Sequence, residues 1–255
     1  MHKIIVITGP TAVGKTKLSI ELAKKYDGEI INADAVQVYK GLDIGSAKVT
    51  EEKKEGIPHH LLDFKEVTEE YTIYHYQKDC REKIKDIQSR NKTPILVGGT
   101  GLYIKSALYD YKLSEEKNTN TYDNLTNEEL YEELKKLDKD IIIDKDNRRR
   151  LIRAINYYKE NNESINKNKT NKLLYNVIFI GLTTDRQVLY DKINKRVDEM
   201  ISQGLLEEVK SFYDKGIKSK PLLNAIGYRE LYNYLDGNCT KEEAIEKIKQ
   251  NSRHY

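Results

Sequence analysis

Short apolar runs alternate with longer segments of helical spacing over the first hundred residues. KIIVIT (Lys3–Thr8) is rich in β-branched residues and has the length of a buried strand, as do EIIN (Glu29–Asn32) and PILVGG (Pro94–Gly99). NVIFIGL (Asn176–Leu182) has the same character much later in the chain. Because strands separated by helices pair in parallel, the pattern predicts an α/β fold, with a parallel sheet flanked by helices.

Apolar residues at helical spacing fill the intervals between these runs. Leu18, Leu22 and Tyr26 fall on one face of the segment that follows the first strand. A predicted helix over residues 71–90 places four side chains on one side: Tyr76, Cys80, Ile84 and Ile87. Two amphipathic segments beyond Thr183, residues 204–216 and 241–255, predict further helices.

The composition changes between about Asp110 and Asn171, where Lys, Asn and Glu dominate. Residues 127–141 and 148–160 keep helical spacing, and the polar tract over 160–172 predicts a mobile loop. We therefore predict a core domain formed by residues 1–109 and 172–255, and a smaller helical insertion domain over 110–171.

The overall charge and the cysteines limit the classes of function. The 44 basic and 41 acidic side chains nearly cancel, so a polyanionic partner needs a local basic patch. Cys80 and Cys239 lack the spacing of metal ligands, which favours a reducing compartment over a disulfide scaffold. The longest apolar runs have strand length, and the first strand begins at Lys3 without room for a signal peptide. We expect a soluble cytoplasmic protein without a membrane segment.

A phosphate-binding motif lies between the first predicted strand and the first predicted helix. GPTAVGKT fits the pattern G-x-x-x-x-G-K-[ST], which directs backbone N–H groups and the positive end of a helix dipole at one spot. Lys15 adds a point charge, and the Thr16 hydroxyl is a candidate ligand for Mg²⁺. The predicted phosphate-binding residues are Gly9, Pro10, Thr11, Ala12, Val13, Gly14, Lys15 and Thr16.

Polar residues follow the ends of two further predicted strands. The carboxyl ends of parallel strands line the ligand crevice, so Asp34, Gln37 and Thr100 should lie near Lys15. Asp34 is a candidate proton acceptor or a water-mediated magnesium ligand, or else it caps its own loop. The Gln37 amide suits a nucleobase edge, and Thr100 in GGTG (Gly98–Gly101) suits a hydrogen bond to a ligand. PILVGG ends in glycine where a nucleotide hydrolase usually carries a magnesium-binding aspartate, which argues against a simple ATPase.

The strongest basic cluster is NRRRLIRAI, residues 147–155. On a helix, three of its arginines at i, i+1 and i+4 share one face: Arg149, Arg150 and Arg153. This face suits binding to a phosphate backbone, or else it is a solvated face whose charge is balanced by neighbouring acids. The adjacent His59 and His60 have no supporting ligand spacing, and we expect them to be structural.

Together these segments resemble the tRNA dimethylallyltransferases, enzymes with a P-loop NTPase-like fold that modify the adenosine immediately 3′ of the anticodon. The matching segments run in the family's order along nearly the whole chain: GPTAVGKT, INADAVQVYKGLDIGSAK, GIPHHLLD, PILVGGTGLY, NRRRLIRA, KRVDEMISQGLLEEV and AIGYRE. The P-loop alone is shared by many proteins, whereas the aspartate loop and the GGTGLY strand end are far more specific. Ala35 departs from the family, whose members often carry serine there.

The resemblance implies that the P-loop holds the diphosphate of dimethylallyl diphosphate. The exocyclic amine of a flipped-out adenine would attack the allylic carbon while Asp34 takes the amine proton. Lys15, Thr100, Arg196 and Mg²⁺ held by Thr16 would stabilise the departing diphosphate. The residues implied to contact the anticodon stem-loop of tRNA are Asp34, Ala35, Val36, Gln37, Thr100, Arg149, Arg150, Leu151, Ile152 and Arg153. We expect a monomer.

Three other functions remain open at this point. In a P-loop small-molecule kinase, Asp34 would orient an acceptor hydroxyl and the arginine segment would close over ATP. An adenylate isopentenyltransferase would use a free nucleotide as acceptor, although the basic insertion favours tRNA. A non-enzymatic RNA-binding module would not need catalytic residue types at the strand ends.

Overall fold

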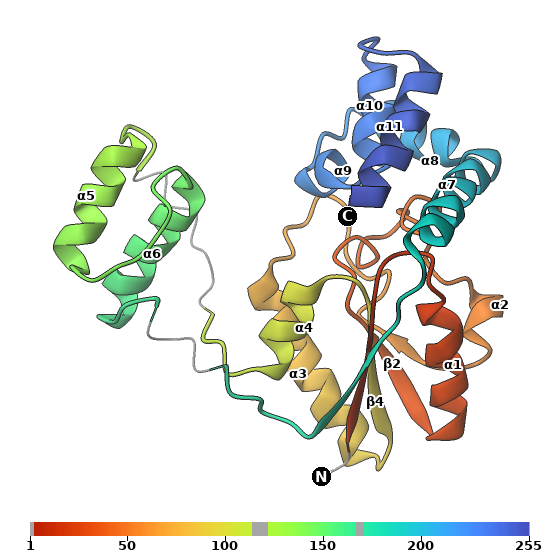
Figure 1. Cartoon of the computed structure of the whole chain (residues 1–255), viewed down its shortest axis with the longest axis horizontal. Helices are drawn as coiled ribbons and strands as arrows, with labels where there is room; N and C mark the ends of the chain where they lie inside the picture. The colour runs from red at the N-terminus through yellow and green to blue at the C-terminus, as the bar shows by residue number, and fades with distance from the viewer. Residues whose placement is uncertain (1–2, 114–121, 167–170, 255) are drawn as a thin grey trace. The chain divides into compact units, whose positions relative to one another are not determined.

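The computed structural model describes residues 3–113, 122–166 and 171–254 of the chain (Figure 1). It divides into two compact units. One unit contains Met1–Ala107 and Tyr175–Tyr255, and the other contains Leu108–Leu174.

The first unit is built on a parallel sheet of five strands in the order β3-β2-β4-β1-β5. The strands are β1 (Ile4–Thr8), β2 (Gly28–Asn32), β3 (His59–His60), β4 (Thr93–Val97) and β5 (Val177–Gly181). The four strands predicted from apolar runs are confirmed, except that β4 ends at Val97, before the two glycines. The two-residue β3 was not predicted, because a pair of histidines has no strand periodicity.

Helices cover both faces of this sheet. In Figure 1, α1 (Lys15–Lys25) lies on one face, and α3 (Ile73–Ser89) and α4 (Gly101–Leu108) lie on the other. The four side chains predicted to share one side of α3 are all fully buried: Tyr76, Cys80, Ile84 and Ile87. The edge strand β5 is covered less well, since Ile178 and Phe179 are exposed.

A group of helices lies beyond the carboxyl ends of the strands (Figure 1). They are α7 (Arg186–Ser202), α8 (Leu205–Tyr213), α9 (Lys220–Asn224), α10 (Tyr228–Leu235) and α11 (Lys241–His254). Of these, α11 packs on both α7 and α10, and α10 also packs on α8. A short helix, α2 (Glu51–Lys54), precedes β3. The helices predicted over 204–216 and 241–255 are confirmed as α8 and α11.

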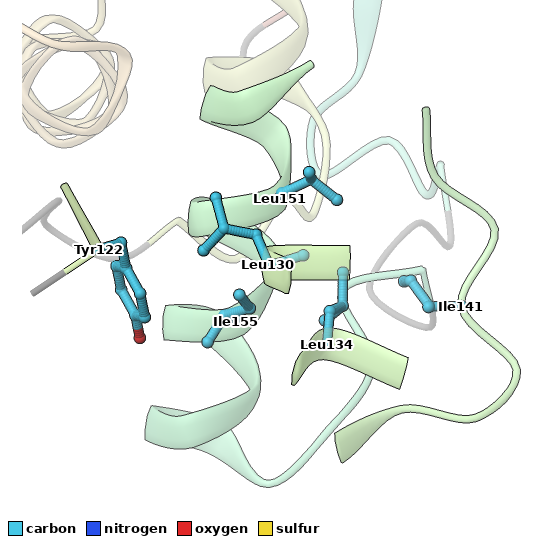
Figure 2. Close-up of a cluster of buried hydrophobic side chains, with 7 residues drawn as sticks. Tyr122, Leu130, Leu134, Ile141, Leu151 and Ile155 are labelled. Atoms are coloured by element: carbon cyan, nitrogen blue, oxygen red, sulfur yellow. The ribbon is translucent and has the colours of Figure 1, made fainter. Parts of the chain in front are cut away.

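Among its described residues, the second unit contains the helices α5 (Asn127–Leu137) and α6 (Arg148–Asn161). Its core is a cluster of buried side chains from both helices and the segments beside them (Figure 2): Tyr122, Leu130, Leu134, Ile141, Leu151, Ala154 and Ile155. The predicted helix over 127–141 ends earlier, at Leu137, because Asp138 is extended. Of the tract predicted to be a mobile loop, residues 167–170 lie outside the described residues.

Candidate active site

The phosphate-binding loop connects β1 directly to α1. Gly14 is left-handed, with φ 96°, and it caps α1 without a side-chain hydrogen bond, so no capping side chain competes with a ligand for the first N–H groups of the helix. A Cβ atom on Gly9 would lie 2.4 Å from the carbonyl oxygen of Leu182. Glycine at this position therefore lets the loop lie against the segment that follows β5.

Lys15 is folded back over its own loop. Its ammonium donates hydrogen bonds to the carbonyl oxygens of Gly9 (2.8 Å) and Pro10 (2.7 Å). Burial lowers the pKa of Lys15, the Asp34 carboxylate acts in the opposite direction, and the Arg196 cation lowers that pKa further. An incoming anion that replaces the two carbonyl contacts would relieve the repulsion between these cations.

Asp34 occupies the loop after β2 and uses one of its two carboxylate oxygens to hold that loop. Oδ1 accepts hydrogen bonds from the backbone N–H groups of Val36 (2.8 Å) and Gln37 (3.3 Å). The Asn32 side chain brackets Asp34 from the strand, accepting from its N–H and donating to its carbonyl, at 3.1 Å in both cases. Oδ2 accepts no hydrogen bond from the residues that the structure describes, so it is available to take a proton. The carboxylate thus caps its loop and still keeps a free oxygen.

The GGTG segment brings the end of β4 against the end of β2. A Cβ atom on Gly98 would lie 2.2 Å from the carbonyl oxygen of Ala33, so only glycine permits this approach. The backbone N–H of Thr100 donates to the same oxygen (3.1 Å), and the Thr100 hydroxyl accepts from the N–H of Ala35 (3.2 Å). Thr100 therefore supports the Asp34 loop without using its own hydroxyl proton.

Arg196 reaches the phosphate-binding loop from α7. Its Nη1 atom donates to the Thr11 hydroxyl at 3.0 Å. Burial lowers the pKa of Arg196, while the Asp34 carboxylate raises it. This residue lies 185 positions from Thr11 in the chain, and only the packing of α7 above the strand ends brings the two side chains together.

These groups line one cavity of about 750 Å³ in the first unit. Lys15, Asp34 and Arg196 all border it. Its apolar wall comes from α7, α11 and the segment before α10: Ile193, Val197, Met200, Ile226 and Ile248. Polar groups border it elsewhere: Asn224, Arg229, Asn251, Ser252 and His254. Sequence analysis missed all of these wall residues, although KRVDEM and AIGYRE contain several of them.

Not every predicted site residue borders this cavity. Val36 and Gly99 do, whereas their neighbours Gln37 and Thr100 are not among its lining residues. The Gln37 amide donates to the carbonyl oxygen of Ser46 at 3.0 Å. Thr16 is exposed on the first turn of α1, where its hydroxyl makes no hydrogen bond with the described residues.

The predicted RNA-binding segment lies in the second unit, on α6. Arg149, Arg150 and Arg153 are exposed, as expected for a face that meets a polyanion. The Leu151 side chain is fully buried in the core of this unit, and Ile152 packs against the same core. The contact of Leu151 and Ile152 with tRNA that the resemblance implies stays a prediction, and the burial of the Leu151 side chain leaves its backbone as the part that could make it.

The histidine pair has structural contacts. His60 Nε2 lies 2.7 Å from a carboxylate oxygen of the buried Glu29, and His59 Nδ1 lies 2.8 Å from the carbonyl oxygen of Ile57. Across residues 3–113, 122–166 and 171–254, no cluster of three His, Cys, Asp or Glu side chains is placed to hold a metal ion. No helix in these ranges is long and apolar enough to cross a membrane.

The fold and the cavity define a class of α/β protein in which a P-loop faces a carboxylate and an arginine across one binding site. Comparison with known families agrees, since residues 37–255 match the family model described as IPP transferase. The chain belongs to the IPP transferase family.

Individual relatives cover the whole chain. The chain is 51% identical to the tRNA dimethylallyltransferase of Anoxybacillus flavithermus, over 100% of this chain and 85% of that protein. It is similar in structure to the tRNA delta(2)-isopentenylpyrophosphate transferase of Staphylococcus epidermidis, with 42% identity, TM-score 0.75, and coverage of 100% and 87%. A eukaryotic dimethylallyltransferase acting on tRNA is 32% identical, with TM-score 0.91, over 100% of this chain and 68% of the other.

Proposed function

We propose that this enzyme transfers the dimethylallyl group of dimethylallyl diphosphate to N6 of the adenosine 3′-adjacent to the anticodon in tRNA, releasing diphosphate. The observation that carries the proposal is the meeting of Lys15, Arg196 and Asp34 at one cavity. Two cations there suit a leaving group that gains negative charge, and a carboxylate beside them suits an amine that loses a proton.

The donor's diphosphate would bind at the start of α1. The N–H groups of the first turn, the Lys15 ammonium and the Arg196 guanidinium would donate to its oxygens. Thr100 is not among the residues that line the cavity, but it follows Gly99, which is, and its hydroxyl proton, unused in the contact with Ala35, would be donated to the same group.

Magnesium fits the exposed Thr16 hydroxyl as a ligand. No protein cluster among the described residues supplies a full coordination shell, so most ligands would be diphosphate oxygens and water, as Mg²⁺ prefers. When bound, the ion would neutralise charge on the leaving diphosphate.

The five-carbon group would lie against the apolar wall of the cavity. Ile193, Val197 and Met200 provide a surface that excludes water from an allylic centre carrying partial positive charge. Protection from water favours transfer to the amine over hydrolysis.

The acceptor adenine would enter from outside the anticodon stack, since its amine is inaccessible in a stacked loop. The free Oδ2 atom of Asp34 would accept the amine proton, and the loop containing Gln37 would face the base. The exposed arginines of α6 would bind the tRNA backbone. We also propose that the protein acts in the cytoplasm, as a monomer.

A transfer assay tests the reaction. The protein is incubated with radiolabelled dimethylallyl diphosphate, Mg²⁺ and unmodified tRNA, with AMP as an alternative acceptor and γ-labelled ATP as an alternative donor. We expect label from the prenyl donor in tRNA only. Label in AMP would indicate a free-nucleotide prenyltransferase, and phosphate transfer from ATP would indicate a kinase.

A further inference from the structure

The Glu208 carboxylate of α8 holds a loop that is more than 160 residues away in sequence. Oε2 accepts hydrogen bonds from the backbone N–H groups of Asp43 (3.1 Å) and Ile44 (2.8 Å), and Oε1 accepts from that of Gly45 (3.1 Å). The Tyr228 hydroxyl, from α10, also donates to Oε1. Four donors therefore converge on one partly buried carboxylate, which fixes residues 43–45 against two helices.

Packing holds the same loop in place. A Cβ atom on Gly45 would lie between 2.5 and 2.8 Å from atoms of the Tyr228 ring and hydroxyl. The loop backbone thus lies directly against the buried Tyr228 side chain. Neither the GLDIG segment nor the AIGYRE segment forms this contact without the other.

The loop held by Glu208, residues 43–45, is connected through Ser46 to Gln37, whose own loop is proposed to face the acceptor base. Ser46, next to Gly45, accepts the hydrogen bond from the Gln37 amide through its carbonyl oxygen at 3.0 Å. Gly45 and Ser46 also border the cavity that contains Asp34 and Lys15. A shift of the 43–46 backbone would therefore move the Gln37 side chain and reshape this part of the cavity.

We propose that Glu208, supported by Tyr228, is a positioning residue for the acceptor side of the site, acting through Ser46 on Gln37. This inference rests on the proposed function, in which the adenine of tRNA enters beside Gln37. It assigns Glu208 no contact with substrate. Binding of the prenyl donor does not depend on the contacts of Glu208, because Lys15 and Arg196 are held by hydrogen bonds to the phosphate-binding loop itself.

Glu208→Gln tests the proposal with little change of shape. An amide nitrogen has no lone pair for an N–H donor, so at least one backbone contact is lost. We expect kcat/KM for tRNA to fall about 10-fold or more, as for loss of hydrogen bonds to a charged group. The KM for dimethylallyl diphosphate should change less than about 2-fold. Glu207→Gln, an exposed neighbour on the same helix, is the matched control and should behave as the wild type.

A double-mutant cycle with Gln37→Ala separates positioning from general loss of stability. If Glu208 acts through Gln37, Glu208→Gln should lower kcat/KM for tRNA less than about 3-fold when Gln37 is already replaced by alanine. Equal losses in both backgrounds, or a parallel rise in the KM for the donor, would overturn the proposal. Tyr228→Phe removes one of the four donors and should show a smaller loss with the same dependence on Gln37, which keeps the test valid should Glu208→Gln unfold. Failure of wild-type protein to modify tRNA would instead refute the proposed function.

Discussion

The N–H group of Ala35 donates a 3.2 Å hydrogen bond to the hydroxyl of Thr100, joining the loop after β2 to the end of β4. The contact fixes the residue next to the proposed base. In this contact the Thr100 hydroxyl acts only as an acceptor, so its own proton is not used. One side chain thus supports the loop and keeps the proton that the proposed mechanism uses.

Thr100→Val should lower kcat for prenyl transfer about 10-fold, since valine keeps the shape but offers no donor to the diphosphate. Thr100→Ser keeps the hydroxyl and should retain most of the rate. Steady-state kinetics with saturating tRNA distinguishes the two variants. Equal rates in both would remove Thr100 from the account of leaving-group stabilisation.

Asp34→Asn should lower the transfer rate roughly 100-fold or more, as for loss of a general base. Binding of tRNA should stay within a few fold, because the amide oxygen can still accept the N–H groups of Val36 and Gln37. Single-turnover rates and a filter-binding titration measure the two effects. Unchanged turnover would dismiss Asp34 as the base.

Gly98→Ala should destabilise the protein by about 2–3 kcal/mol, because its Cβ would overlap backbone atoms of the buried Ala33. Gly99→Ala is the matched control, since no atom lies within 4 Å of a Cβ at that position. Urea unfolding of both variants gives the comparison. Equal stability of the two would show that the strand ends are not closely packed.

Changing Arg149, Arg150 and Arg153 together to alanine should weaken tRNA binding and flatten its dependence on salt, without affecting binding of the diphosphate donor. Replacing three exposed lysines of the first unit provides a control for net charge: Lys25, Lys78 and Lys85. An unaltered salt slope in the arginine variant would indicate that this face of α6 is only solvated.

A buried carboxylate at the opposite end of the sheet predicts the response to acid. Hydrogen bonds from Arg90 are the largest influence on the pKa of Glu29, and they lower it. Burial raises this pKa and the hydrogen bond with His60 lowers it, and the net result is a pKa of about 2. A depressed carboxyl pKa stabilises the folded state above the unfolded value of 4.5, and this contribution is lost as the pH falls toward about 2.

Glu29→Gln should therefore cost about 2–3 kcal/mol near neutral pH. The difference from wild type should shrink between about pH 4.5 and pH 2, as the wild-type carboxylate takes up its proton. Thermal melting across this range measures the difference. A gap that stays constant with pH would contradict the assignment.

Much of the fold follows from local pattern. Strands β1, β2, β4 and β5 are apolar runs of strand length, and the buried face of α3 is visible in its spacing. The strand β3 and the short helix α9 lack any periodic signal. The end of α5 depends on Asp138, whose extended backbone is not visible in a helical pattern that continues past it.

The candidate site was only partly predictable. Asp34 and Lys15 could be placed together because parallel strands bring their carboxyl ends to one edge. Arg196 required the family resemblance, since its position depends on how α7 packs above that edge. The contacts of Glu208 could not be predicted, because no local pattern links a helix surface to a loop 163 residues away.

The position of a bound donor tests the central claim most directly. A crystal structure with an unreactive thio-analogue of dimethylallyl diphosphate should place its diphosphate within hydrogen-bond reach of the Lys15 ammonium and the first N–H groups of α1. The first carbon of the prenyl chain should face the free oxygen of Asp34. A diphosphate bound elsewhere, with the triphosphate of ATP seated at the loop and Asp34 turned away from the base pocket, would contradict the account.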